Sequence, residues 1–315
     1  MPLGRPELMD ADGDLIVLYD FGDRLLKAYS ATGHERWVFG RTTVGEPSFV
    51  NPTDLVVTSD GIQLIDQVAE RRYVVTRDGK LARSDSMPTA PWRIATAAAG
   101  LIGFGYADAR TLAMRYNVAG KPVGTLPLTP DLRSVEFMAR QGSIRGVPHD
   151  AQGGFVLGFR YSGTIERFGA NKLEWATEGI EPVLLPSVLK WRVPGGAVVQ
   201  RVSPAAVVSS LGLSILSDTV FVHFAGRSSY ANRLVDRYRL QDGEYLGSTL
   251  LPMPVARVIR TPRGYIATTT GMRPSLLLLG TSAVRRDRAT HYAADVVPHS
   301  QQDPHRAYTP STSHR

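Results

Sequence analysis

Two series of short turn sequences recur along the chain, and they constrain its fold more than any other feature. The first series precedes apolar runs at intervals of roughly 40 to 65 residues, and it consists of Asp12-Gly13, Asp60-Gly61, Ala99-Gly100, Gly153-Gly154, Ser217-Asp218 and Arg263-Gly264. The second series follows the first by about 17 to 25 residues, and it consists of Thr32-Gly33, Asp78-Gly79, Ala119-Gly120, Ala170-Asn171 and Asp242-Gly243. Two turn series that run in step indicate an internal repeat.

The repeat predicts sheets of four strands. Gly and Asn tolerate the positive φ that tight hairpin turns require, so each unit reads as strand, turn, strand, loop, strand, turn, strand. One such antiparallel sheet cannot bury both of its faces, whereas several sheets packed radially cover one another. Helical periodicity is absent nearly everywhere. We therefore predict an all-β, six-bladed β-propeller of four-stranded antiparallel blades over residues 1–283, with a longer insertion at 179–212.

The two ends of the chain depart from the regular four-stranded unit. The sixth unit supplies about three strands, so we expect its outer strand to come from residues before Arg5 or from Ser282–Val284. Residues 284–315 are polar, lack periodicity and contain four of the seven histidines of the chain. We predict that this segment is a disordered tail.

Residues 14–81 carry a more specific pattern. A strand ends in an acid, Asp20, and is followed by Arg24 and by a strand with an aromatic residue, Tyr29. A turn glycine, a Phe-Gly pair, a G-x-P-x-F segment and a proline come next, at Gly33, Phe39-Gly40, Gly45 to Phe49 and Pro52. The second unit repeats Asp66, Arg71 and Gly79. This pattern resembles the NHL-type and TolB-like six-bladed propellers. The resemblance implies that fold and leaves the activity open.

Composition excludes several classes of site. The chain has no cysteine, which rules out disulfides, thiolate catalysis, cysteine-ligated zinc and iron–sulfur clusters. No apolar stretch reaches the roughly 18 residues of a membrane helix, so we expect no membrane span. The first residues lack a basic region followed by an apolar run, which predicts a cytoplasmic protein as written, or a periplasmic or secreted one if the N-terminus is truncated.

The basic balance does not point to one partner. The formal net charge is +7 and only five of the 36 basic residues are lysine, but the charges are scattered along the chain. A scattered basic surface is the favoured interpretation, so nucleic acid is not an expected partner. Binding of a polyanion on a basic face remains an alternative.

No catalytic motif is present. The G-x-S-x-G nucleophile elbow, the Walker loop and a G-x-G-x-x-G between strand and helix are all missing. Asp10, Asp12 and Asp14 alternate like the start of a calcium loop, but Phe21 stands where the twelfth-position Glu is required. We predict no cofactor and no metal, and we favour a protein that is not an enzyme.

Candidate site residues lie at the strand ends. Asp20 and Asp66 end equivalent strands. We favour the interpretation that each caps its own loop by accepting backbone N–H groups. The alternative is that they contribute to a ring of acids around a cation. His223 alternates with apolar neighbours and is expected to be an ordinary strand histidine. The loop residues Arg41, Arg71, Arg160, Tyr161 and Arg227 share one face and could form a basic mouth, although pairing with acids such as Asp23, Glu70 and Glu166 is favoured.

These features lead to one functional hypothesis and two alternatives. We expect a monomeric, non-enzymatic propeller that binds a protein, peptide or carbohydrate on the face lined by the loops after the second strand of each blade. The residues proposed for this face are Asp20, Arg41, Asp66, Arg71, Arg160, Tyr161, His223 and Arg227. The alternatives are a metal-dependent, lactonase-like hydrolase or lyase at the central axis, and a polyanion binder.

Overall fold

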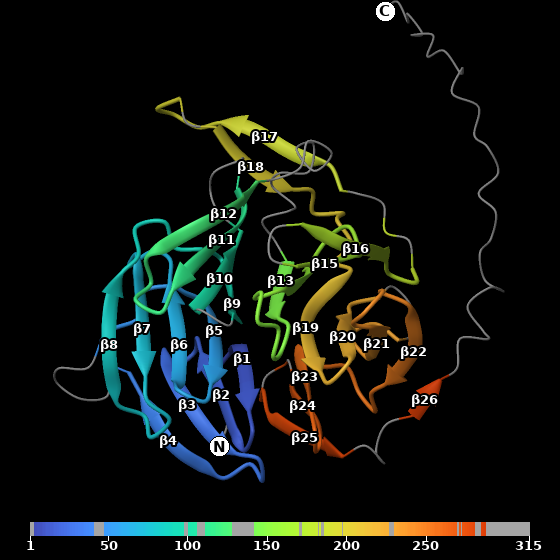
Figure 1. Cartoon of the computed structure of the whole chain (residues 1–315), viewed down its shortest axis with the longest axis horizontal. Helices are drawn as coiled ribbons and strands as arrows, with labels where there is room; N and C mark the ends of the chain where they lie inside the picture. Colours follow the sequence, from blue (N-terminus) through green and yellow to red (C-terminus); the bar gives the residue numbers. More distant parts are fainter. Residues whose placement is uncertain are drawn as a thin grey trace, which may run out of the picture.

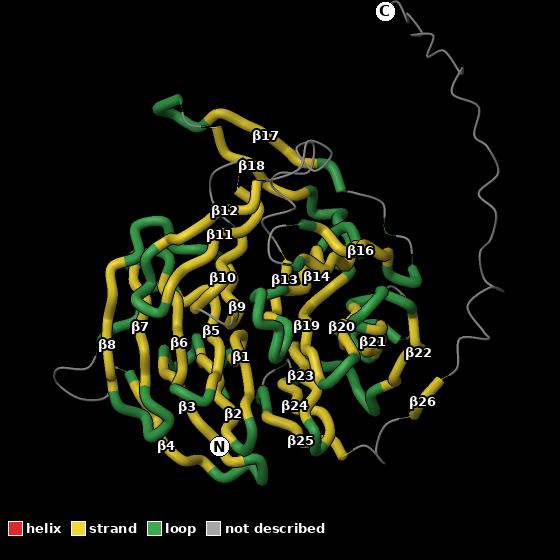
Figure 2. The backbone as a smooth tube through the Cα atoms, viewed as in Figure 1, coloured by secondary structure: helices red, strands yellow, loops and turns green. Residues whose placement is uncertain are grey.

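The computed structural model contains strands, turns and loops and no helix among the residues it describes (Figure 2). The described residues are 3–40, 47–97, 100–105, 111–127, 142–169, 172–181, 183, 186–196, 198–226, 230–269, 271, 273–280 and 285–287. Within them, no helix is long and apolar enough to cross a membrane.

The first three blades have four strands each, in chain order from the inside of the ring outward. Blade one contains β1 (Pro6–Asp12), β2 (Leu15–Asp20), β3 (Leu25–Ser30) and β4 (Glu35–Phe39). Blade two contains β5 (Pro52–Thr58), β6 (Gly61–Asp66), β7 (Arg71–Val75) and β8 (Leu81–Ser86). Blade three contains β9 (Arg93–Ala97), β10 (Gly100–Phe104), β11 (Thr111–Asn117) and β12 (Pro122–Pro127).

The last three blades follow the same order with local changes. Blade four contains β13 (Gly142–Gly146), β14 (Phe155–Phe159), β15 (Thr164–Phe168) and β16 (Leu173–Glu178). Blade five contains β19 (Ser210–Leu216), β20 (Thr219–Phe224), β21 (Leu234–Arg239) and β22 (Tyr245–Leu250). Blade six contains β23 (Arg257–Thr261), β24 (Gly264–Thr268) and β25 (Leu276–Gly280).

The six sheets form a closed ring, as the turn series predicts (Figure 1). The first strand of each blade lies beside the first strands of the two neighbouring blades, and β1 of blade one meets β23 of blade six. The predicted turns lie where expected wherever their residues are described: the first series joins the first and second strands of a blade, and the second series joins the third and fourth strands.

Apolar side chains fill the spaces between the blades. The cluster between blades one and two contains Tyr19, Phe49 and Tyr73, with Phe49 edge-on to both tyrosines at centroid distances of 5.5 Å and 5.2 Å. Radial packing therefore buries the sheet faces that a single blade would leave exposed.

Flat side chains also join successive blades at their outer turns. The ring of Trp37 in β4 lies against Gly79 in the next blade, and its Nε1 donates to the carbonyl of Arg77 at 2.9 Å. Trp175 in β16 lies against Gly243 in the same way, and its Nε1 donates to the carbonyl of Leu240 at 3.0 Å. These contacts explain why small turn residues recur at this position of the repeat.

Two features depart from a regular ring. The predicted insertion contains a hairpin of β17 (Val188–Arg192) and β18 (Val198–Val202), which forms a separate sheet outside the ring (Figure 1). The short strand β26 (Arg285–Asp287) pairs with β22 and extends blade five to five strands.

The ends of the chain differ in part from the prediction. Blade six has three strands among the described residues, and neither Leu3 nor Gly4 pairs with β25 as a fourth strand. The other candidates for that strand, residues 1–2 and 282–284, lie outside the described part. The first described residues of the predicted tail form β26, whose backbone pairs with β22 at the edge of blade five. Residues 288–315 are also outside the described part.

Candidate functional site

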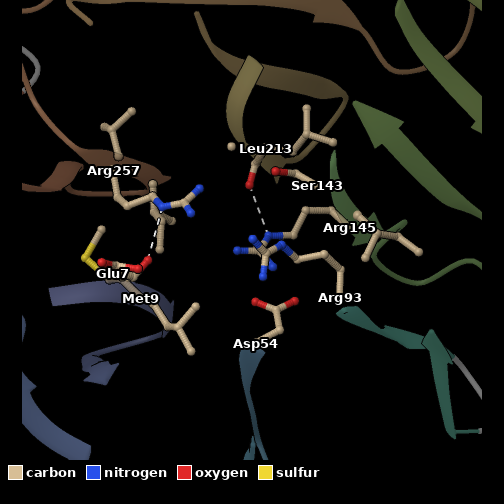
Figure 3. A pocket seen from close by; sticks show the side chains of 13 residues that line it. Glu7, Met9, Asp54, Arg93, Ser143, Arg145, Leu213 and Arg257 are labelled. Carbon is tan, nitrogen blue, oxygen red and sulfur yellow. Dashed lines mark hydrogen bonds between the residues drawn. The ribbon is translucent and has the colours of Figure 1, made fainter. Parts of the chain in front are cut away.

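The inner strands bring charged side chains from several blades to the axis of the ring. Glu7 lies near the start of β1, Asp54 lies in β5, and Arg93 and Arg257 begin β9 and β23. Figure 3 shows these side chains, with Arg145 from β13, pointing toward one another across a central cavity. Each inner strand begins on the same face of the ring, so residues far apart in sequence converge there.

The mouth of this cavity is a pocket of about 110 Å³ on the face that the sequence analysis selected. Its polar side chains come from four blades, and they are Arg93, Ser143, Arg160, Ser210 and Arg257. Trp92, which is 43% exposed, stands at the same pocket. The pocket shares Arg93, Ser143 and Arg257 with the deeper cavity.

Backbone carbonyls hold two of the three pocket arginines. Arg93 Nε donates to the carbonyl of Gly142 at 3.2 Å, and one terminal nitrogen donates to the carbonyls of Thr53 and Trp92. Arg257 Nε donates to the carbonyl of Glu7 at 3.1 Å, and one terminal nitrogen donates to the carbonyl of Leu211. These bonds leave further N–H groups of both planar guanidinium groups available.

Arg160 is held differently. Its guanidinium carbon lies 5.7 Å from the ring centroid of Tyr161, and its buried Nε has no hydrogen-bond acceptor among the described residues. The hydroxyl of Ser210, a residue that is 5% exposed, also has no partner among them. Buried polar groups are normally satisfied, so these two atoms are available to a further partner.

The pocket carries uncompensated positive charge. None of Arg93, Arg160 and Arg257 forms an ion pair with a carboxylate in the described part of the chain, whereas the neighbouring Arg145 pairs with Asp10 at 3.2 Å. Burial, together with the positive charges of Arg93 and Arg160, lowers the pKa of Arg257 to about 10. The charges of Asp54 and Glu7 act in the opposite direction.

The acids near the axis already have partners. Asp54 Oδ2 accepts the backbone N–H of Ile94 at 2.9 Å, and Asp10 Oδ2 accepts that of Val57 at 2.8 Å. Each carboxylate thus joins the inner strand of its own blade to that of the next. Glu7 pairs with Arg5 at 2.8 Å.

Asp20 and Asp66 are structural caps, as the favoured interpretation states. Asp20 is fully buried and accepts backbone N–H groups of Gly4, Arg5 and Gly22 at 2.8, 2.6 and 3.0 Å. Asp66 is equally buried and accepts those of Val50, Asn51 and Ala69 at 2.6, 3.1 and 3.0 Å. Each carboxylate ties its own loop to the segment that enters the same blade.

The predicted pairing of the loop arginines with acids is wrong for the residues that the structure describes. Arg71 donates to the Ser84 hydroxyl at 3.0 Å and Arg160 lies over Tyr161, while Asp23 pairs with Lys27 instead. Of the predicted site residues that the structure describes, only Arg160 lines the pocket. Arg41 and Arg227 lie outside the described part of the chain.

His223 is a buried strand histidine next to the site. Its Nε2 lies 3.5 Å from the carbonyl oxygen of Asn232, and its Nδ1 has no partner. Burial lowers the pKa of His223 to about 4, and the charge of Arg257 contributes to this shift. Among the described residues, no group of three or more His, Cys, Asp or Glu side chains could hold a metal ion.

Sequence reasoning missed most of the pocket. Arg93 and Arg257 begin the first strands of their blades at the same distance before a turn of the first series, Ala99-Gly100 and Arg263-Gly264. Aligning the units on these turns would have placed both arginines at the inner strands. No comparable signal marks Ser143 or Ser210.

Comparisons with known proteins identify the fold. No protein-family model matches the sequence, and no curated protein matches it. The WD40 domain of Pan2 from Neurospora crassa is similar in structure with a TM-score of 0.52 at 10% identity, covering 90% of this chain and 78% of that one. A protein from Bacteroides fragilis has a TM-score of 0.54 at 10% identity, covering 85% and 80%. At such identity these likenesses establish the β-propeller fold alone.

Proposed function

We propose that this protein is a non-enzymatic binding propeller that takes its ligand into the axial pocket at the mouth of the ring. The observation that carries the proposal is the convergence of Arg93, Arg160, Ser210 and Arg257 from four blades on one pocket, with buried polar atoms left unsatisfied. A ring of rigid sheets that presents side chains from several blades to one cavity is suited to binding.

The ligand class follows from the shape of the pocket. A cavity of about 110 Å³ admits a small group, while Trp92 and Tyr161 beside it offer aromatic surface to the rest of the ligand. A peptide, a protein segment or a carbohydrate with one projecting group fits this arrangement. The proposed module is a monomer.

The blade type is a finer part of the proposal. Asp20 and Asp66 make equivalent caps at the ends of β2 and β6, in the region whose sequence resembles the NHL-type and TolB-like propellers. Two equivalent blades with one capping device support assignment to that type of propeller.

The two alternative functions receive unequal support. A metal-dependent hydrolase or lyase needs converging ligands, and the described carboxylates at the axis are engaged with backbone N–H groups or with arginines. A polyanion binder would need a broad basic surface, whereas the arginines that converge at the axis line one small pocket.

The test compares two serine substitutions. Ser143 lines both the pocket and the deeper cavity, so Ser143→Leu fills the site, while Ser59→Leu adds the same side chain to an exposed turn on the opposite face. Both variants and the wild type are applied to arrays of glycans and short peptides. We expect ligands that bind the wild type and Ser59→Leu but not folded Ser143→Leu. Ligands that bind all three proteins equally would refute the axial site.

A further inference from the structure

We propose that the axial pocket is a subsite for a single oxyanion, a carboxylate or phosphate group of the ligand, held by Arg93, Arg160 and Arg257 with the hydroxyl of Ser210. This inference rests on the proposed function and names the chemistry that the same site recognises. Four residues from blades three, four, five and six supply the donors.

The geometry leaves donors free in the pocket. Carbonyl acceptors fix Arg93 and Arg257 through Nε and one terminal nitrogen each, so the other terminal nitrogen of each fork has no described acceptor. Arg160 Nε and the Ser210 hydroxyl are buried without partners in the described part of the chain. Guanidinium forks match the oxygens of carboxylate and phosphate groups, which accept several N–H bonds at once.

The electrostatics favour an anion over a cation or a neutral group. Three positive side chains line a pocket in which no described carboxylate pairs with any of them. The acids that could have neutralised them are committed, because Asp10 pairs with Arg145, Glu7 pairs with Arg5 and Asp54 accepts the N–H of Ile94. Burial and the repulsion by Arg93 and Arg160 lower the pKa of Arg257, and a bound oxyanion would offset both effects.

A purely structural role explains the cluster less well. Structural arginines in this chain have acidic or carbonyl partners, as Arg72 does with Asp85 at 2.6 Å and with the carbonyl of Val118 at 3.0 Å. Arg160 has neither among the described residues, although its position brings it to the pocket. Like charges placed together without a counter-ion destabilise a fold, which indicates that an external anion completes the site.

The experiment measures binding of inorganic phosphate and of acetate by titration calorimetry at low ionic strength. We expect at least one of them to bind the wild type with a dissociation constant of about 1 mM or tighter. The stronger of the two identifies the subsite as one for phosphate or for carboxylate groups. Failure of both to bind at about 10 mM would overturn the inference.

Three variants locate the binding. Arg160→Gln should weaken it about tenfold or more. Ser210→Ala should weaken it severalfold with the fold intact, because the hydroxyl has no partner to lose among the residues that the structure describes. Arg36→Gln is the matched control: it removes the same charge from an exposed side chain that pairs with Asp14, so binding should stay within about twofold.

The outcomes separate this inference from the proposed function. Equal loss in Arg36→Gln and Arg160→Gln, or no loss in folded Arg160→Gln and Ser210→Ala, would place the anion elsewhere and refute the subsite. If Ser143→Leu abolishes binding of array ligands while neither phosphate nor acetate binds the wild type, the axial site stands and its oxyanion chemistry is wrong.

Discussion

Replacing Asp20 by Asn tests whether this predicted site residue is a structural cap. In the folded protein, Oδ1 accepts the N–H groups of Arg5 and Gly22, and Oδ2 accepts the N–H of Gly4 and the ammonium of Lys27, the last at 2.9 Å. Burial raises the pKa of Asp20, but these hydrogen bonds outweigh burial and hold the pKa below its usual value. The charged carboxylate is therefore the form that the fold stabilises, and its contribution is lost as the pH falls through the folded pKa.

The magnitude follows from counting the donors that lose an acceptor. An Asn side chain keeps one oxygen and places an NH₂ group where Oδ2 lay, facing the N–H of Gly4 and the ammonium of Lys27. Each buried donor left without an acceptor costs about 1–3 kcal/mol, and a broken buried ion pair costs about 3–5 kcal/mol. We expect Asp20→Asn to lower the free energy of unfolding by about 3–5 kcal/mol.

Asp66→Asn is the internal comparison. Oδ2 of Asp66 accepts only the N–H of Val50, and no lysine contacts the carboxylate among the described residues. One donor loses its acceptor, so the expected loss is about 1–3 kcal/mol. Asp14→Asn, which affects exposed ion pairs with Arg36 and, at 4.0 Å, with Arg77, should leave stability unchanged.

Urea unfolding at pH 7, followed by tryptophan fluorescence, measures all three variants, with an unchanged m-value as the criterion for a common unfolded state. Equal losses for Asp20→Asn and Asp66→Asn, or a loss below about 1 kcal/mol for Asp20→Asn, would refute the donor count. Phosphate or acetate binding should be unchanged in both variants. Lost binding in folded Asp20→Asn would show that the residue belongs to the functional site.

Two further predictions concern the blade contacts and the pH dependence of stability. Gly243 has φ +75° and a Cβ there would lie 2.7 Å from the Trp175 ring, whereas Gly13 has φ +61° and open space where a Cβ would lie. In thermal or urea unfolding, Gly243→Ala should therefore lower the free energy of unfolding by about 2–4 kcal/mol and Gly13→Ala by about 1–2 kcal/mol. Equal losses would contradict the tryptophan contact. Burial raises the pKa of Glu166 to about 7 from 4.5, so its neutral form favours the fold and it contributes a loss of stability on the order of 3 kcal/mol as the pH rises through that interval. Burial lowers the pKa of His223 to about 4 from 6.5, so its contribution is lost as the pH falls through that interval. The free energy of unfolding of the wild type, Glu166→Gln and His223→Gln is measured at several pH values. With rising pH, the difference between the wild type and Glu166→Gln should fall, whereas the difference between the wild type and His223→Gln should grow. Differences that do not change with pH would show that neither group titrates with folding.

The turn pattern could be read from the sequence because its causes are local. Positive φ at residues such as Gly13 and Gly79 is a requirement of the turn itself, and it is visible wherever glycine recurs in step. The apolar runs between the turns then specify strands, and their number specifies the ring. The capping role of Asp20 was also accessible, because an acid at a strand end accepts nearby N–H groups.

The pocket could not be read in the same way, because it depends on contacts between residues far apart in the chain. Arg93, Arg160, Ser210 and Arg257 become neighbours only when six sheets close into a ring of fixed radius, with each inner strand starting on the same face. The pairing of β26 with β22 is likewise non-local, since it depends on which sheet edge lies within reach. Backbone preferences act over a few residues and are written in the sequence, whereas which side chains face each other at the axis is decided by the packing of whole blades.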